Sequence, residues 1–381
     1  MISRHIDMAL HNHHLKKAYL SHRKLFLEFL FKNHRNKKGP IPDDSPKSIL
    51  VVAPPRIGDI ALALPVFHAL RENFPDTKID VVAKGYVSDL FSLIGQVDRV
   101  MKAADGITDR YRQLSQMKRS EYDVAIDLNF DYHLFPALVA SLAGSFSIGY
   151  DYAGRGLIFS KKLPGPERDK HMVEIFLAPL RRLIPAIPVV DPCIEISDQL
   201  ALETEKVLRI IGISAKDLLI LVHPGAHHPT QRWFPEYFAD IADKIIEAGM
   251  AKLVFIGGPQ DKNLVKHIQS LMGQRADGAF LGLAVKNLIG LIDRADLMIC
   301  NNSGPLHLAA ATSTATVSTM GPTIKERWMP IGHIHKVFRR DDLSCIGCNF
   351  GFCRIGSHDC MRLITPSMLF AAVEDLLPVS S

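Results

Sequence analysis

Leu297-Met-Ile-Cys-Asn-Asn-Ser-Gly-Pro-Leu-His307 joins a short apolar run to a helix-forming segment. The apolar run is typical of a strand that is covered on both faces. Ser303 and Gly304 permit a tight turn, and the proline that follows suits the first position of a helix. The free amides and the positive dipole end of such a helix start are a ready seat for phosphate. The stretch therefore predicts a strand, a phosphate-binding turn and a helix, with a turn that holds no ligand as the alternative.

A second strand–turn–helix unit lies far upstream, at Ile49-Leu-Val-Val-Ala-Pro-Pro-Arg-Ile-Gly-Asp-Ile-Ala-Leu-Ala-Leu-Pro65. Its first five residues form another buried strand, and a helix is expected to run to about Asn73. Asp59 stands near the start of that helix, after Gly58, which permits close approach of the backbone. Ligands of open α/β sheets sit outside the carboxyl ends of strands. Asp59 is therefore a candidate for chemistry, although a carboxylate that only complements the helix dipole is the simpler interpretation.

Strands and helices alternate along most of the chain, which predicts parallel sheets. The expected strands are 49–53, 78–83, 97–101, 123–127 and 148–150, and then 218–223, 252–256, 278–281, 296–300 and 315–319. Helices are expected at about 171–183 and 198–212. The length of 381 residues suits two domains, for which we expect bounds of 47–190 and 191–381.

The composition is that of an ordinary globular protein, with 47% hydrophobic and 22% charged residues. Its apolar stretches are shorter than a bilayer span, and no secretory signal pattern stands at its start. We therefore expect a cytoplasmic protein whose six cysteines stay reduced unless they bind a metal.

Positive charge is concentrated in the first 40 residues, which hold nine Lys and Arg against two acidic residues. Between His14 and Phe31 these basic residues interleave with leucines and phenylalanines. We expect residues 1–46 to form a basic amphipathic extension and a linker, with residues 1–38 on an anionic inner-membrane surface. An extension that is solvated or packed on its own protein is the alternative. Nucleic acid is not expected as a partner, because the basic segment is otherwise apolar.

Taken together, these motifs resemble those of glycosyltransferase family 9, the ADP-heptose:lipopolysaccharide heptosyltransferases and their relatives. The resemblance runs in order from about Ser48 to Leu377. The segments that carry it are Arg56-Ile-Gly-Asp59, Pro65–Leu70, Val222-His-Pro-Gly-Ala226, Arg232-Trp233, Phe255–Pro259, Arg294–Leu297, Ser303–His307, Gly321-Pro-Thr323 and Arg327-Trp328. It implies an α/β protein with two Rossmann-like domains facing a cleft (the GT-B fold). It also implies a final helix, 366–377, that crosses back to the first domain.

The same resemblance implies an inverting transfer of a sugar, heptose from an ADP-heptose-type donor, onto lipopolysaccharide or another lipid-linked or oligosaccharide acceptor. Asp59 matches the catalytic aspartate of the family and is expected to act as general base. The expected donor-binding residues are His223, Gly225, Arg232, Gly258, Asp261, Asn302, Ser303, Gly304, His307 and Thr323. No cofactor is expected for the transfer step. A catalytically silent sugar-nucleotide-binding protein and a nucleotide-sugar epimerase of similar fold are the alternatives.

Some of these residues also have simpler interpretations, and two positions depart from the family pattern. Asp261 could be a helix-start carboxylate, and Arg232 could lie over Trp233 as a cation on an aromatic ring. Relatives usually carry Asp where this chain has Asn302, and often Lys where it has Gln231. Each change removes a charge, so a different donor, slower chemistry or lost activity would follow if these side chains touch the donor.

Four cysteines gather near the carboxyl end as Cys345-x2-Cys348-x4-Cys353-x6-Cys360. The spacing within a glycine-containing loop suits a tetrahedral structural zinc. An iron–sulfur cluster fits the spacing less well, and free or redox-active thiols are the other alternative.

Overall fold

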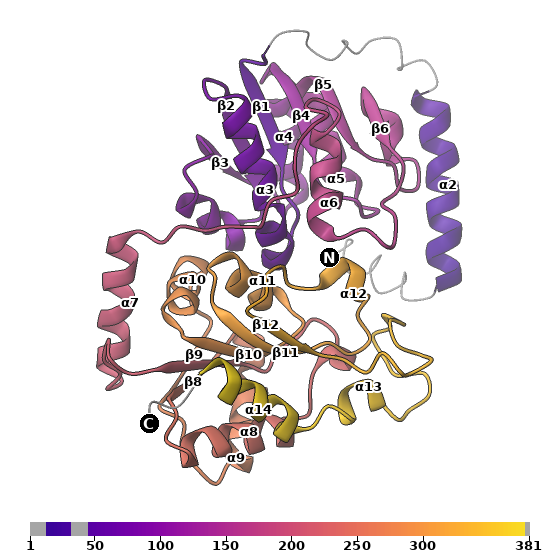
Figure 1. The fold of residues 1–381 in the computed structure, drawn as a ribbon. Coiled ribbons are helices and arrows are strands. Elements are labelled where there is room, and N and C mark those ends of the chain that lie inside the picture. The colour runs from indigo at the N-terminus through magenta and orange to yellow at the C-terminus, as the bar shows by residue number, and fades with distance from the viewer. Residues whose placement is uncertain (1–12, 32–44, 378–381) are drawn as a thin grey trace.

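The computed structural model describes residues 13–31 and 45–377. Its two parallel sheets have six strands each, in the orders β3-β2-β1-β4-β5-β6 and β12-β11-β10-β7-β8-β9 (Figure 1). Helices connect successive strands of each sheet. The prediction of an α/β protein with two Rossmann-like halves is confirmed.

The first half contains β1 to β6, and its central strand β1 pairs with β2 and β4. Its elements are β1 (Ser48–Val52), α3 (Ile57–Asn73), β2 (Lys78–Ala83), η2 (Gly85–Leu93), β3 (Arg99–Lys102), α4 (Ile107–Met117), β4 (Tyr122–Asp127), α5 (Leu134–Ala143), β5 (Gly144–Tyr150), η3 (Arg155–Ile158), β6 (Lys161–Leu163) and α6 (Met172–Leu180). Strand β1 is apolar and almost wholly buried because helices cover both faces of the sheet.

The second half contains β7 to β12, with β10 between β7 and β11. Its elements are α7 (Asp198–Ile210), β7 (Leu219–His223), η4 (Pro229–Gln231), α8 (Pro235–Glu247), β8 (Lys252–Gly257), η5 (Pro259–Asp261), α9 (Lys262–Leu271), β9 (Gly278–Leu281), α10 (Val285–Arg294), β10 (Leu297–Asn301), α11 (Gly304–Ala311), β11 (Ala315–Thr319), α12 (Lys325–Trp328), β12 (His335–Phe338), α13 (Asp359–Arg362) and α14 (Pro366–Leu376). The sequence did not predict the two edge strands β6 and β12, which are short and partly exposed.

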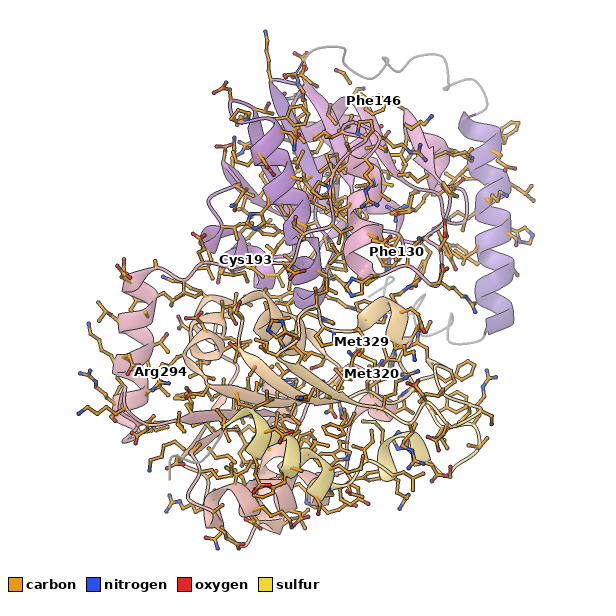
Figure 2. All side chains as sticks on the ribbon, viewed as in Figure 1. Phe130, Phe146, Cys193, Arg294, Met320 and Met329 are labelled. Atoms are coloured by element: carbon orange, nitrogen blue, oxygen red, sulfur yellow. The ribbon has the colours of Figure 1, made fainter. Side chains whose placement is uncertain are left out.

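A continuous apolar core joins the two halves. One cluster of buried side chains extends from β1 and α3 of the first half to α10 and α11 of the second. The connecting segment contributes as well, because the amide of Ile194 donates to the carbonyl of Ala311 at 2.8 Å. Phe130 and Met329, labelled in Figure 2, lie on the two sides of this junction, and Cys193 lies on the segment that links the halves.

Helix α14 does not cross back to the first half as the resemblance implied. It packs against α8 and β11 of the second half, where Leu369 and Val373 join the buried cluster around Trp233. The helix has a buried apolar face that matches this nearby surface, so its tertiary contacts are satisfied within the second half.

The basic extension contains a helix, α2 (His13–Phe31), which stands beside the first half (Figure 1). Leu27 on its inner side is only 4% exposed, so the helix is packed on the protein. Within residues 13–31 and 45–377, no helix combines the length and the hydrophobicity that crossing a membrane requires.

Candidate functional site

The starts of α3 and α11 meet where the two halves touch. A Cβ added to Gly58 would lie 2.8 Å from the Cα of Gly304, and a Cβ on Gly304 would lie 2.8 Å from Cγ2 of Ile57. Only glycine permits this backbone approach. The contact brings Asp59, the residue after Gly58, beside the turn that starts with Ser303. The two segments that the sequence singled out therefore lie together, although Asp59 and Ser303 are 244 positions apart along the chain.

Asp59 lies in the first turn of α3, in surroundings that disfavour its charge. Burial raises the pKa of its carboxyl to about 6, Arg56 opposes that rise, and the nearby carboxylate of Asp131 adds to it. At neutral pH the group is still mostly ionised, and a base with a pKa close to the working pH is well suited to accept a proton. The carboxylate can therefore serve as the general base that the resemblance implies.

Arg56 is a candidate that the sequence interpretation did not assign to the site. Its guanidinium reaches across the junction to Nε2 of His227 at 3.3 Å. Its positive charge helps to lower the pKa values of His227 and His228, after the larger effect of burial. The signal for Arg56 was available, because it opens the Arg56–Asp59 motif. Its exposed guanidinium beside a helix start could pair with a diphosphate.

The loops of the second half are held together by Asn301, at the end of β10. Its fully buried amide donates to the carbonyl of Pro224 at 2.8 Å, and its side-chain oxygen accepts from the amide of Trp233 at 2.8 Å and from the hydroxyl of Thr319 at 2.9 Å. Asn301 thus ties the loop after β7 and the end of β11 to the end of β10, just before the start of α11. The sequence did not single out this residue.

His223 and Ser303 lie side by side at the carboxyl ends of β7 and β10, with Ser303 Oγ and His223 Nδ1 3.3 Å apart. Burial lowers the pKa of His223 to about 4, with Asp261 opposing and Arg232 adding to the effect. His223 is therefore neutral at physiological pH and can share a hydrogen bond with the serine hydroxyl.

Asp261, Gly225 and Gly258 form one tightly packed corner. The buried Asp261 carboxylate accepts from the amide of Gly258 at 2.9 Å. A Cβ on Gly225 would lie 2.8 Å from both oxygens of that carboxylate. This placement matches the simpler interpretation of Asp261, a carboxylate that orders the start of a helix. Gly225 and Gly258 then serve to let their loops lie close to the Asp261 carboxylate.

Arg232 does not lie over Trp233. Its guanidinium instead donates to the carbonyl of Ala226 at 3.2 and 3.1 Å. Trp233 is 1% exposed, and its indole donates to the carbonyl of Ile364 at 2.8 Å, so it belongs to the core. Nearby, the side-chain amide of Gln231 donates to Thr323 Oγ1 at 3.4 Å, which brings two predicted donor-side positions together.

Asn302 and His307 are both buried near α12. The Asn302 amide donates to the carbonyl of Trp328 at 3.0 Å, a bond that an aspartate could not make. The ring of His307 lies 5.9 Å from that of Trp328, and its Nδ1 has no hydrogen-bond partner among the described residues. Burial lowers the pKa of His307 to about 3, so the ring is neutral.

The carboxyl ends of β4 and β5 form the other side of the surroundings of Asp59. Arg155 is completely buried and pairs with the buried Asp127. The same guanidinium donates to the carbonyl of Asn129 at 3.1 Å and to that of Asp131 at 2.9 Å. This network fixes the loop that carries the Asp131 carboxylate toward Asp59.

The four clustered cysteines line a common pocket of about 190 Å³, together with Phe350, Phe352 and His358. Nevertheless, the described residues include no group of three or more His, Cys, Asp or Glu side chains placed to hold a metal ion. Burial raises the pKa of Cys360 to about 11, with the three other thiols adding to the rise, so it stays a neutral thiol. The placement of these residues therefore does not support the predicted zinc site at Cys345, Cys348, Cys353 and Cys360.

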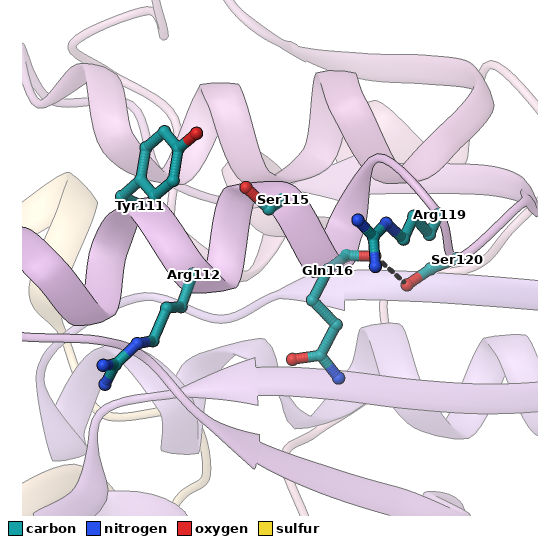
Figure 3. A pocket seen from close by; sticks show the side chains of 6 residues that line it. All are labelled: Tyr111, Arg112, Ser115, Gln116, Arg119 and Ser120. Carbon is teal, nitrogen blue, oxygen red and sulfur yellow. Dashed lines mark hydrogen bonds between the residues drawn. The ribbon is translucent and has the colours of Figure 1, made fainter.

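A larger hollow of about 410 Å³ lies on the outer surface of α4, away from this site (Figure 3). It is open and lined by four residues of α4 and two of the turn that follows, Tyr111, Arg112, Ser115, Gln116, Arg119 and Ser120. It adds nothing to the juxtaposition of Asp59 and Ser303.

The geometry agrees with the comparisons with known proteins. Residues 110–354 match the family model described as glycosyltransferase family 9 (heptosyltransferase). The chain belongs to glycosyltransferase family 9. It is therefore an enzyme that transfers a sugar, and its two halves form the GT-B fold of that family.

Several relatives of this family 9 enzyme are similar over most of their length. It is 25% identical to lipooligosaccharide heptosyltransferase 2 of Haemophilus influenzae, over 87% of this chain and 99% of that protein. Among solved structures, the ADP-heptose lipopolysaccharide heptosyltransferase II of E. coli is 22% identical, with a TM-score of 0.74 over 87% of this chain and 98% of that one. A family 9 glycosyltransferase of Veillonella parvula is 21% identical, with a TM-score of 0.77 over 90% and 100%.

Proposed function

We propose that this glycosyltransferase moves heptose from an ADP-heptose-type donor onto a lipopolysaccharide or lipooligosaccharide core acceptor, with inversion at the anomeric carbon. The observation that carries the proposal is the contact between Gly58 and Gly304, which brings a carboxylate and a helix start together. The names of the relatives support heptose as the sugar and ADP as the leaving nucleotide.

In the proposed reaction, the Asp59 carboxylate takes the proton of an acceptor hydroxyl as its oxygen attacks the anomeric carbon of the donor. The bond from that carbon to the diphosphate oxygen breaks, and its electron pair leaves with the diphosphate. The backbone amides of Ser303 and Gly304 and the hydroxyl of Ser303 would donate hydrogen bonds to the leaving diphosphate as its negative charge develops. Arg56 would add a positive charge from the opposite half. This step uses no cofactor.

On the donor side, we assign the leaving group to the loops that end β7 and β10. Neutral His223 would orient the Ser303 hydroxyl, while Gly225 and Gly258 would let the backbone approach the nucleotide. Two further groups would lie beside the donor: the guanidinium of Arg232, which bonds to a carbonyl, and the hydrogen-bonded pair of Gln231 and Thr323. Asn302 and Asp261 would act by shaping the loops, because each already bonds to another group of the protein. His307 would act in the same way, because its side chain is buried.

We propose further that the enzyme works on the cytoplasmic face of the inner membrane, where the basic extension (residues 1–38) attaches it to the surface that carries the acceptor. The excess of positive charge in this extension and the exposed apolar side chains of α2 support the attachment. A lipid-linked acceptor would then be presented to an enzyme already concentrated at the same surface.

The decisive experiment compares Asp59→Asn with the unchanged enzyme, using ADP-heptose and a lipid-linked core oligosaccharide. Removing the general base should lower kcat by about 10²–10⁴-fold while ADP binding stays unchanged. The matched control is Asp76→Asn, an exposed aspartate after α3, which should retain full activity. Product formation by mass spectrometry and ADP binding by calorimetry provide the two readouts. Full turnover by Asp59→Asn would overturn the assignment.

The same variant separates catalysis from folding. The raised pKa means that ionised Asp59 costs the folded state stability at neutral pH, so replacing it by Asn should leave the melting temperature unchanged or higher.

A thermal-shift comparison of ADP-, UDP-, GDP- and CMP-sugars tests the donor, because a ligand that binds the folded protein raises its melting temperature. Stabilisation by a different nucleotide alone would contradict the ADP assignment.

A further inference from the structure

Helix α2 is tied to two loops of the first half through Arg23. One nitrogen of its guanidinium donates to the carbonyl of Tyr132, and the other donates to the carbonyls of Tyr152 at 3.4 Å and Ala153 at 3.2 Å. Tyr132 lies in the loop after β4, and the other two residues follow β5. A single side chain from the extension thus bridges two loops at the carboxyl edge of the sheet.

The helix fits this surface closely. Gly154 has a φ of +85°, and a Cβ at this position would lie 3.0 Å from the Cα of Lys24. Leu27, one turn further along the same side of α2, is buried. The backbone of the helix therefore rests directly on the loop that contains Tyr152 and Ala153.

The loops that Arg23 holds are the ones that Arg155 holds from within. Arg155 binds the carbonyls of Asn129 and Asp131, and Arg23 binds the carbonyl of the next residue, Tyr132. The side-chain amide of Asn129 donates to the carbonyl of Ala53 at 3.2 Å, directly after β1 and before the turn that leads to Asp59. The carboxylate of Asp131, in the same loop, adds to the rise in the pKa of Asp59. Contacts therefore run from α2 through one loop to the surroundings of the proposed general base.

The outer side of α2 presents apolar side chains to the surroundings. Leu25, Phe26 and Phe29 are 64%, 61% and 79% exposed, and their spacing places them on one side of the helix, away from Leu27. The first 40 residues hold nine basic residues against two acidic ones, which suits a surface of negative charge with an apolar interior. An anionic lipid layer has both properties.

We propose that α2 is part of the acceptor site. Arg23 is a positioning residue that holds the loops after β4 and β5 beside Asp59, while the outer face of the same helix (Leu25, Phe26 and Phe29) enters the lipid layer that carries the acceptor. The inference rests on the proposed function, in which the acceptor is lipid-linked. It adds a coupling: the element that meets the lipid also fixes the loops that receive the sugar acceptor.

The inner contact is tested with Arg23→Ala and Arg23→Lys in the full-length enzyme. Loosening the loops should raise the KM for a deacylated, water-soluble core acceptor by about tenfold and leave the KM for the donor unchanged. Lysine should restore little, because its single ammonium group cannot span carbonyls on two loops. Amide hydrogen exchange should become faster in residues 129–133 and 151–155. An unchanged acceptor KM together with unchanged exchange overturns the role of Arg23.

The outer contact is tested with Phe26→Ser/Phe29→Ser. This variant should bind vesicles of phosphatidylglycerol and phosphatidylethanolamine ~10-fold more weakly. It should also be slower with the lipid-linked acceptor and equally fast with the soluble one. The matched control is Leu202→Ser/Ile210→Ser on α7, whose side chains are 62% and 84% exposed on the second half. The control should retain vesicle binding.

Two results would overturn the lipid assignment. In one, the phenylalanine variant binds vesicles as well as the unchanged enzyme. In the other, the unchanged enzyme is a dimer that this variant converts to a monomer without loss of vesicle binding, which would identify a second copy as the occupant. Failure of the proposed function is distinguishable, because the unchanged enzyme would then transfer no heptose to either acceptor, whereas hydrogen exchange and vesicle binding would still test Arg23 and the outer face.

Discussion

At the scale of single residues, the site combines one carboxylate whose pKa is raised with histidines whose pKa values are lowered. Burial is the largest cause in each case, and it disfavours the charged form of both residue types. Asp59 is thereby made a better proton acceptor near neutral pH. His223 and His307 remain neutral, so neither competes with it as a charged acid.

This difference predicts the pH dependence of the transfer. Asp59 must be ionised to act as base, so kcat/KM should fall about tenfold per pH unit below its pKa of about 6 and level off above it. The histidines, with pKa values of about 4 and 3, cannot produce a break at that pH. Initial rates measured between pH 4.5 and 9 provide the check. A rate that is level down to pH 5 would exclude Asp59 as the base.

The hydrogen bond of Asn302 predicts that changing this residue lowers the stability of the protein, whereas a contact with the donor would predict a change in donor binding. Asn302→Asp would restore the family residue, yet it would remove the donor to the carbonyl of Trp328 and bring a negative charge against that oxygen. Losing this buried hydrogen bond should cost about 1–3 kcal/mol in the free energy of unfolding. Denaturant unfolding is the measurement, and Asn302→Ala is the companion variant. If Asn302→Asp is as stable as the unchanged protein and binds donor more tightly, the side chain contacts the donor.

At the scale of elements, the site depends on two helix starts that face each other. Both turns belong to strand–helix units of the same kind, one from each sheet, and each ends a central strand. The carboxyl ends of the two central strands therefore point toward a common place. The close approach of α3 and α11 is possible because glycine stands on both sides of the contact.

Gly58→Ala should separate these two helices. The added methyl would meet the Cα of Gly304 at 2.8 Å, and neither backbone can move without shifting its helix. The shift changes the distance between Asp59 and the phosphate-binding turn at Ser303, which should lower kcat/KM by roughly 10- to 100-fold. Gly95→Ala is the matched control, because a Cβ there would meet nothing within 4 Å.

The measurement is kcat/KM together with circular dichroism, which shows whether the fold is retained. Gly304→Ala tests the same contact from the other side, where the methyl would meet Ile57. Wild-type activity in both glycine variants would show that the contact does not set the geometry of transfer.

At the scale of the whole molecule, the two halves share one apolar core. Buried residues of α3 and α11 belong to the same cluster, so opening the junction exposes side chains that both halves need to bury. We therefore expect the halves to unfold together.

This expectation is testable because both tryptophans, Trp233 and Trp328, belong to the second half. Trp233 lies in the core of the second half, whereas Trp328 packs against the shared cluster, so tryptophan fluorescence reports on the second half and the junction. Far-ultraviolet circular dichroism reports on both halves. The two probes should give coincident urea transitions. Two separated midpoints would show that the halves are independent units and that the shared cluster contributes little.

Most of the helices and strands could be predicted from the sequence, because apolar runs of strand length and helix-start residues act locally. The predicted strand 315–319 is unchanged in the structure, and 49–53 is shifted by only one residue. The motif residues that come together at the junction, Asp59, Ser303 and Gly304, were likewise visible as loops after buried strands. The edge strands β6 and β12 were missed because they are short and carry little apolar signal.

The contacts of each side chain depend on the packing of the folded chain. Asn302 and Asp261 have partners within the protein, Arg56 reaches the opposite half, and α14 packs on the half that contains it. Local patterns fix the conformation of a segment, whereas hydrogen-bond partners, desolvation and pKa shifts arise from residues distant in the chain. The sequence therefore specified the two facing turns, and packing alone determined their separation and the electrostatic surroundings of Asp59.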